Sequence, residues 1–208
     1  MSLFITFEGG EGSGKSTALR KISELLIEKG YETVLTREPG GTPISEEIRE
    51  VILDKKNTDM DKRTEALLYA ASRRQHLVQK VWPALKEGKL VLCDRYLDSS
   101  LAYQGGARGI GLEDVLNINL FATENTFPDL TLLFDIDPKI GLARIAANAS
   151  REVNRLDLEK LSFHEGVRKT FLELAARYPE RFVIIDASKS PDKVVEDSMK
   201  AILARLEK

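Results

Sequence analysis

The sequence predicts an α/β protein in which helices cover both faces of a parallel sheet. Short apolar segments alternate with segments of helical periodicity along the whole chain, and this alternation is typical of consecutive β–α–β units. Residues 90–93 form an unbroken apolar run, as expected for a strand buried on both faces. A glycine-rich loop lies between the first apolar segment and the first helix, which is where such folds bind anionic ligands.

Five apolar segments are expected to form the sheet. They cover residues 3–7, 33–36, 90–93, 130–134 and 182–185. Helical periodicity predicts helices over residues 19–29, 44–53, 64–82, 113–123, 140–147, 158–177 and 191–206. Gly30 is expected to cap the first helix, and Pro83 to end the third, because its ring and missing N–H disrupt a helix. The four glycines in residues 105–111 predict a mobile loop.

Length and composition limit the class of protein. A chain of 208 residues can bury a core, so we expect residues 1–208 to form a single domain. The 31 basic and 33 acidic residues give a net charge of −2, which argues against general binding to nucleic acids or membranes. The lone cysteine, Cys93, suits a reducing compartment and is expected in the core. No apolar run approaches the roughly 18 residues of a membrane span and no signal-peptide pattern is present, so we expect a cytoplasmic protein.

Residues 9–17 read GGEGSGKST and match the phosphate-binding pattern G-x-x-x-x-G-K-[ST]. Glycines let the backbone curl around phosphates and aim several N–H groups at one point, and the following helix N-terminus adds partial positive charge. Lys15 is expected to reach the outer phosphates and Ser16 to hold Mg²⁺. The pattern therefore predicts a nucleotide and magnesium site. The expected contacts in the loop are Gly9, Gly10, Glu11, Gly12, Ser13, Gly14, Lys15, Ser16 and Thr17.

A carboxylate is also needed near the metal, at the end of a buried strand. Asp94 and Asp135 both follow predicted strands. We favour Asp94, because Arg95 follows it and would pair a metal-side carboxylate with a phosphate-side cation. Asp135 precedes a proline-started segment and is instead expected to cap the helix after Pro138.

Several arginines fall near the predicted carboxyl ends of the strands. They are Arg37, Arg73, Arg95, Arg144, Arg151 and Arg155. A reaction that passes a phosphoryl group between two anions needs several such cations to hold the substrates and neutralise charge. Arg74, Arg108 and Arg177 are interpreted as solvated surface charges. The chain lacks the NKxD motif by which switch GTPases recognise guanine, so the pattern favours a small-molecule kinase.

Four segments together resemble bacterial thymidylate kinases. They read FEGGEGSGKST, TREPGGT, DRYLDSSLAYQGG and NRLD…FHEGV, and the resemblance runs from Phe4 to about Arg181. It implies a P-loop NTPase-type three-layer fold with a monophosphate site and a short mobile lid, here about residues 146–155. It also implies ATP- and Mg²⁺-dependent phosphorylation of dTMP to dTDP by a homodimer.

The resemblance assigns roles around the phosphates. Glu11 matches an acid that contacts the 3′-hydroxyl of dTMP. Arg95 would hold the dTMP phosphate, with Asp94 at the magnesium waters. Arg37 would line the same phosphate region, and Arg144 is expected to contact ATP.

The resemblance also assigns roles around the base and sugar. Tyr69 matches the aromatic residue that stacks on thymine, although plain core packing is the alternative. Arg73, one helical turn later, would hydrogen-bond the base. Ser100 and Gln104 resemble polar contacts to the base. Tyr103 matches a residue beside the sugar 2′ position and would exclude ribonucleotides.

The phosphate loop contains no arginine, so charge on the transferring phosphoryl group must be neutralised from elsewhere. The predicted lid supplies Arg151 and Arg155, which we expect to reach the ATP phosphates. We prefer Arg151 as the group that stabilises transfer, while Arg155 could do so instead or could anchor the lid.

Two other functions are left open by the residues. The first is a kinase of another monophosphate or of a deoxynucleoside. The residues distinguish it only weakly from a dTMP kinase, because the thymine methyl group contributes only about 1–3 kcal/mol in a pocket. A nucleotide-binding switch without turnover would bind nucleotide and transfer phosphate to no acceptor. The second anion site and the lid arginines argue against the switch.

Overall fold

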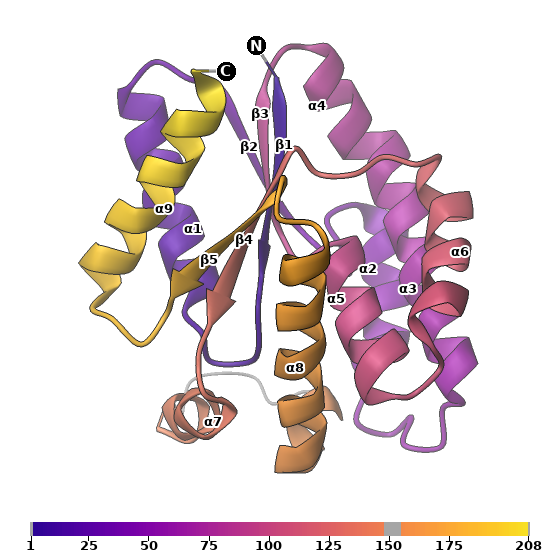
Figure 1. Cartoon of the computed structure of the whole chain (residues 1–208). Coiled ribbons are helices and arrows are strands. Elements are labelled where there is room, and N and C mark those ends of the chain that lie inside the picture. The colour runs from indigo at the N-terminus through magenta and orange to yellow at the C-terminus, as the bar shows by residue number, and fades with distance from the viewer. Residues whose placement is uncertain (1, 148–154, 208) are drawn as a thin grey trace.

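The protein is built around a parallel sheet, as the alternating pattern predicts. The computed structural model describes residues 2–147 and 155–207, and within them five strands pair in the order β2-β3-β1-β4-β5 (Figure 1). All four pairings are parallel. The strands are β1 Leu3–Glu8, β2 Thr33–Arg37, β3 Leu90–Asp94, β4 Leu130–Asp135 and β5 Phe182–Asp186. Each predicted strand is therefore confirmed to within one residue at either end.

Helices cover both faces of the sheet and form the outer layers (Figure 1). Those of the described residues are α1 Lys15–Glu28, α2 Pro43–Leu53, α3 Lys62–His76, α4 Trp82–Lys86, α5 Leu97–Ser100, α6 Leu112–Thr123, α7 Pro138–Ala146, α8 Leu161–Arg177 and α9 Pro191–Leu206. α1 and α9 pack together on one face, while α8 lies on the other face with the group formed by α2, α3 and α6. The three-layer prediction is thus confirmed.

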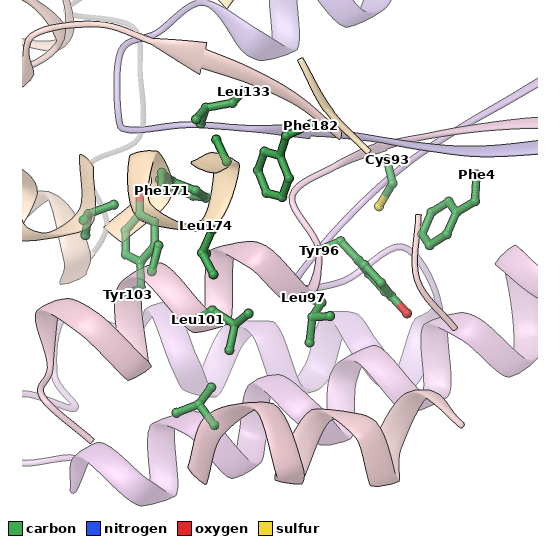
Figure 2. Close-up of a cluster of buried hydrophobic side chains, with 14 of the residues drawn as sticks. Phe4, Cys93, Tyr96, Leu97, Leu101, Tyr103, Leu133, Phe171, Leu174 and Phe182 are labelled. Carbon is green, nitrogen blue, oxygen red and sulfur yellow. The ribbon is translucent and has the colours of Figure 1, made fainter. Parts of the chain in front are cut away.

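The strands divide their side chains between two hydrophobic clusters. On β1, Phe4 enters the cluster that includes Phe171 and Leu174 of α8, whereas Ile5 and Phe7 enter the cluster formed with α1 and α9. Figure 2 shows the first of these clusters. Neighbouring side chains on a strand point to opposite faces of the sheet. Because helices cover both faces, the side chains on both sides of β1 are buried.

Gly30 ends α1 as predicted. Its φ of +89° lies in the left-handed region, and its N–H donates to Ile27 O at 2.9 Å. The next N–H, from Tyr31, donates to Leu26 O at 3.0 Å. These two bonds form a Schellman cap, which satisfies carbonyl groups that the helix leaves without partners.

Pro83 does not end the helix that precedes it, so that prediction is wrong. The chain passes from α3 through a π-helical turn, Leu77–Val81, directly into α4. The N–H of Trp82 donates to Leu77 O, five residues back. The wider π turn displaces the carbonyl groups that a proline ring would meet in a regular helix, and Pro83 then occupies the tolerated first turn of α4.

The predicted mobile loop at residues 105–111 is also wrong over its first part. Residues Leu101–Ala107 form a second π-helical segment that packs against α8. A Cβ atom on Gly106 would lie 2.1 Å from Oγ1 of Thr170 on α8. Gly105 and Gly106 therefore permit close helix packing, and the turn that follows occupies residues 108–111.

Most of the predicted lid, residues 148–154, lies outside the described residues, and so does Arg151. Among the described residues, none of the helices has the length and apolar character needed to cross a membrane.

Candidate active site

A cavity of about 950 Å³ lies where the segments after β1, β2 and β3 meet, as expected for the carboxyl ends of a parallel sheet. Most of the predicted site residues line it. They are Glu11, Gly12, Ser13, Gly14, Lys15, Ser16, Thr17, Arg37, Tyr69, Arg73, Asp94, Arg95, Ser100, Tyr103, Gln104 and Arg144. Gly9 and Gly10 stand behind this lining and present carbonyl oxygens to Lys15. Arg155 is not part of it.

Close packing fixes the shape of the phosphate loop. Gly12 has a φ of +68°, and a Cβ atom there would lie 2.1 Å from the carbonyl oxygen of Gly141 in α7. A Cβ atom on Gly9 would lie 2.4 Å from the carbonyl oxygen of Phe134 in β4. The loop is thus held against β4 and α7 at positions that only glycine can occupy.

Lys15 is the first residue of α1 and is held by the loop itself. Its Nζ donates to Gly9 O and Gly10 O, both at 3.0 Å, and to Ser13 Oγ at 3.2 Å. Burial lowers the pKa of Lys15 to about 8. Phosphate oxygens that entered the loop would replace these acceptors and favour the charged ammonium group.

Ser16 and Asp94 meet at the mouth of the loop. Ser16 Oγ donates to Asp94 Oδ2 at 2.6 Å, which places a hydroxyl and a carboxylate side by side. The described residues contain no group of three or more His, Cys, Asp or Glu side chains arranged for a metal. Mg²⁺ commonly takes only one or two protein oxygens and completes its shell with water and phosphate, so this pair fits it.

Asp135 pairs with Arg168 of α8. Its carboxylate accepts from Arg168 Nε at 2.7 Å and Nη2 at 2.9 Å. The expectation that Asp135 caps α7 is wrong, because Asp137 holds that position and accepts from the N–H of Lys139 at 2.8 Å.

Glu11 sits in the loop opposite Arg95 and Tyr103. Arg95 Nη2 donates to Glu11 Oε1 at 2.6 Å, and the Tyr103 hydroxyl donates to the same oxygen at 3.0 Å. The Arg95 guanidinium lies 5.0 Å from the centre of the Tyr103 ring. These two donors explain how an acid is accommodated beside a site for polyphosphate.

Comparison with known proteins identifies the family. The family model described as thymidylate kinase matches residues 7–198. This chain belongs to the thymidylate kinase family. It is 61% identical over 203 residues to the thymidylate kinase of Halalkalibacterium halodurans, covering 98% of this chain and 97% of the relative. It is 56% identical over 204 residues to that of a Geobacillus species, with the same coverage.

A solved structure supports the same assignment. The crystal structure of thymidylate kinase from Ehrlichia chaffeensis matches with a TM-score of 0.78 and 33% sequence identity, covering 97% of this chain and 98% of that one. The sequence family and the fold therefore agree, and both identify the chain as a kinase.

Arg73 is buried in the wall of the cavity, with 1% of its surface exposed. Its Nε donates to Glu38 Oε2 at 2.7 Å, and its Nη1 donates to Ser100 Oγ at 3.0 Å and to Asn119 Oδ1. Glu38 also contacts His76 Nδ1 at 2.8 Å. The guanidinium group is therefore fixed in orientation before any ligand binds.

Gln104 and Arg155, which are predicted to contact the base and ATP respectively, both donate to Glu65. Glu65 accepts from Gln104 Nε2 at 2.8 Å and from Arg155 Nη2, while Arg155 Nε donates to Ile52 O at 3.0 Å. Burial opposes ionisation of Glu65, but these donors hold its pKa below the usual value. The expected contact between Arg155 and ATP does not match this geometry, which fits the anchoring alternative. Arg108, interpreted as a surface charge, also pairs with Glu65 at 3.3 Å and is mostly buried.

Sequence reasoning missed five charged residues in the cavity wall, which are Lys21, Glu38, Arg49, Lys189 and Asp192. Arg49 Nη1 donates to Pro39 O at 2.9 Å, and burial together with neighbouring Arg37 lowers its pKa. Arg37 is held by Glu46 through two bonds of 2.8 and 2.9 Å. Arg49 lies on α2, a helix that is predicted from the spacing of its apolar residues. Such spacing does not show that a charged residue on the same helix, here Arg49, faces a cavity.

Proposed function

We propose that this protein transfers the γ-phosphoryl group of ATP to the phosphate of dTMP, forming dTDP, in the cavity described above. Family membership supports the reaction. The observation that carries the proposal is the presence of two cationic sites in one cavity. Lys15 occupies the phosphate loop, and Arg37, Arg49 and Arg95 line the same cavity from β2, α2 and the segment after β3, where the acceptor would bind. Two polyanions brought together for transfer need such a pair of sites.

Ser16 and Asp94 would hold Mg²⁺ at the mouth of the loop. When bound, the ion neutralises charge on the ATP phosphates and fixes their geometry. The loop amides and Lys15 would bind the same phosphates, and Arg144, which donates to Ala187 O at 3.1 Å, lines the ATP side. Mg²⁺ and ATP are both part of the proposal.

The acceptor site is proposed to hold dTMP by its phosphate, sugar and base. Arg95 and Arg37 would bind the phosphate, and Arg49 is positioned to join them. Glu11 would accept from the 3′-hydroxyl group in place of one of its present donors. Tyr103 stands beside Glu11, where a ribose 2′-hydroxyl group would be crowded.

The base would lie against Tyr69 and Arg73. The Tyr69 ring lines the cavity and is only half-buried, which supports stacking over plain core packing. Arg73 offers donors only, so it suits a carbonyl group of thymine. Ser100, which accepts from Arg73, and Gln104 also line the cavity and would complete the polar contacts proposed for the base.

Catalysis in this proposal comes from positioning and charge stabilisation, without a protein nucleophile. A phosphate oxygen of dTMP attacks the γ-phosphorus in line, and ADP leaves. Arg151, outside the described residues, stays our proposed transfer-stabilising group. Arginines in this role can be worth about 10³ to 10⁵ in rate.

We also propose that residues 1–208 form a single domain and that the protein is a cytoplasmic homodimer. It is proposed to bind neither nucleic acids nor membranes. The net charge of −2 supports the absence of general polyanion binding. Exposed apolar side chains on α2, α3 and α6 support association between copies. They include Val51, Leu67 and Phe121.

A coupled assay of ADP release tests the function. Mg-ATP is offered with dTMP, dUMP, UMP, CMP, AMP, GMP or thymidine, and the expected result is a strong preference for dTMP. Preference for another acceptor would retain the kinase and reject the proposed base pocket. Nucleotide binding without acceptor-dependent ADP release would favour a switch protein.

A further inference from the structure

Glu8 is a fully buried carboxylate at the end of β1 to which neither the sequence patterns nor the proposed reaction assigns a role. Its Oε1 accepts from the N–H of Tyr96 at 2.7 Å and from the N–H of Ser99 at 3.3 Å. Its Oε2 accepts from the Ser99 hydroxyl at 2.5 Å. Glu8 therefore joins β1 to the segment that follows β3 and carries Arg95.

A directed chain of hydrogen bonds runs from the cavity to Glu8. Arg95 Nη1 donates to Gly9 O at 2.9 Å and to Ser99 Oγ at 3.3 Å, and the Ser99 hydroxyl donates onward to Glu8. A hydroxyl group has one hydrogen and two acceptor lone pairs. An ionised Glu8 takes the hydrogen, so it leaves the lone pairs of Ser99 facing Arg95.

Arg95 needs such support because its backbone is held in an uncommon conformation. Its φ is +68°, in a region that residues with a side chain seldom adopt and that persists only where surrounding contacts enforce it. Two of those contacts fall on the flanking backbone: Arg95 N donates to Phe7 O at 3.0 Å, and the next N–H, from Tyr96, donates to Glu8. Loss of the Glu8 carboxylate would release the second contact and the Ser99 link together.

We propose that Glu8 is a positioning residue for Arg95: through the Tyr96 amide and the Ser99 hydroxyl, it holds the guanidinium group in the orientation that binds the acceptor phosphate. This inference rests on the proposed function, in which Arg95 holds the phosphate of dTMP. Glu8 does not line the cavity and acts entirely through its neighbours.

The electrostatic surroundings make the role of Glu8 sensitive to its ionisation. Burial, followed by the nearby Asp98, raises the pKa of Glu8 to about 8. The charged or titratable groups around it are Asp98, Arg95, Lys15, Arg181 and Cys93. A protonated Glu8 would instead donate to Ser99 Oγ, and the Ser99 hydrogen, having lost its acceptor, would turn toward Arg95 and oppose the bond from its guanidinium group.

The experiment compares kcat, the KM for dTMP and the KM for ATP in wild type, Glu8→Gln and Ser99→Ala. Above pH 8, where Glu8 is ionised, both variants are expected to raise the KM for dTMP, by about tenfold for Glu8→Gln and less for Ser99→Ala, and to leave the KM for ATP within about twofold. At saturating ATP, the wild-type kcat/KM for dTMP should rise as the pH passes upward through about 8. Glu8→Gln should lose that rise.

Asp98→Asn is the matched control. Asp98 is equally buried and close to Glu8, but its carboxylate pairs with Arg181 at 2.7 and 2.8 Å and not with the Arg95 segment. Measured above pH 8, where Glu8 is ionised with or without Asp98, this variant should lower the melting temperature and leave both KM values nearly unchanged. Equal increases in both KM values for Glu8→Gln, in step with lost stability, would show a structural role and overturn the inference.

Ser99→Ala decides the question if Glu8→Gln does not fold, because it retains the carboxylate and removes only the link to Arg95. An unchanged KM for dTMP in Ser99→Ala would then overturn the inference. An inactive wild type would reject the proposed function together with the inference, whereas an active wild type with unaffected variants rejects the inference alone.

Discussion

Lys15 illustrates how a single residue prepares the site for its ligand. In the free protein its ammonium group is surrounded by two loop carbonyl oxygens and the Ser13 hydroxyl, and burial lowers its pKa to about 8. At pH 8 about half of the molecules would therefore carry a neutral Lys15. Bound polyphosphate favours the charged form and raises the pKa again.

We predict that ATP binding takes up about half a proton at pH 8, falling toward zero below about pH 7, where Lys15 is already charged. The sign follows because the pKa is low in the free protein and higher in the complex. Titration calorimetry of Mg-ATP in two buffers with different ionisation enthalpies measures the uptake. Lys15→Arg, which stays charged at this pH, is the control without uptake, and identical wild-type heats in both buffers would contradict the prediction.

At Tyr103, two substitutions test the contributions of the hydroxyl group and of the ring separately. The ring packs against Phe163 and Phe171 at centroid distances of 6.1 and 6.3 Å, while the hydroxyl donates to Glu11. Tyr103→Phe removes only that bond and should cost about 1 kcal/mol of unfolding free energy. Tyr103→Ala removes the ring, should cost about 3–5 kcal/mol, and should improve the use of ribonucleotides.

The measurement is the ratio of kcat/KM for dTMP to that for the corresponding ribonucleotide. We predict that Tyr103→Phe retains the preference for the deoxyribose sugar, because the ring that crowds the 2′ position is intact. Tyr103→Ala should reduce the preference. If Tyr103→Phe alone abolishes it, the hydroxyl group and its bond to Glu11 set the selectivity, and steric exclusion by the ring is wrong.

The sequence predicts residues whose chemistry is recorded in a local pattern and misses those whose role depends on folding. The phosphate loop is contiguous, so its spacing alone predicts Lys15 and Ser16. Glu8 precedes the same loop, yet its partners Tyr96 and Ser99 lie about ninety residues away. No periodicity links such positions, because contacts across a sheet are fixed only by strand order and register.

At the level of elements, glycine produced both a correct and a wrong prediction. Gly30 is correctly predicted to cap α1, because it directly follows a helical segment. The glycines of residues 105–111 predict a mobile loop, but Gly105 and Gly106 belong to a helical segment packed on α8. The reason for a small residue there is the approach of Thr170, which lies in a distant element that local sequence does not reveal.

This packing contact gives a prediction for the element pair. Gly106→Ala would place Cβ 2.1 Å from Thr170 Oγ1, so the Thr170 side chain or the packing of the segment on α8 must shift. We expect the free energy of unfolding to fall by about 1–3 kcal/mol, measured by urea denaturation. Gly166→Ala is the matched control on the same interface, because its Cβ would meet Ala107 at an ordinary 3.7 Å.

The control should be neutral or slightly stabilising, since alanine is favoured over glycine within a helix by about 1 kcal/mol. Equal effects for the two variants would show that the contact with Thr170 relaxes at little cost. The interpretation of Gly106 as a packing residue would then be wrong.

For the whole molecule, the alternating pattern was sufficient to predict a parallel three-layer fold, because parallel strands require covering helices. The strand order β2-β3-β1-β4-β5 is not contained in periodicity. The position of the site nevertheless follows from topology, since the loops after β1, β2 and β3 must share one edge of the sheet. The predictions of a homodimer and of dTMP as the substrate rest on the family resemblance, because the residue patterns alone do not give them.

The proposed homodimer gives the prediction at this scale. α3 packs against both α2 and α6, and these helices form one side of the molecule in Figure 1. Phe121 of α6 is 90% exposed, which is unusual for a large aromatic side chain unless a partner covers it. We therefore predict that wild type sediments at twice the chain mass of 23.3 kDa and that Phe121→Glu sediments as a monomer, because a dimer would bury the unpaired charge.

Ile27→Glu is the control for this experiment. Ile27 is 58% exposed, but it lies on α1, in the opposite helical layer, so its variant should stay dimeric. Analytical ultracentrifugation at several protein concentrations distinguishes the species. A dimeric Phe121→Glu beside a monomeric Ile27→Glu would place the interface on the α1 side instead, and a monomeric wild type would reject the homodimer. Because the charge at residue 121 is added outside the cavity lining, the variant also shows whether a separated subunit retains dTMP kinase activity.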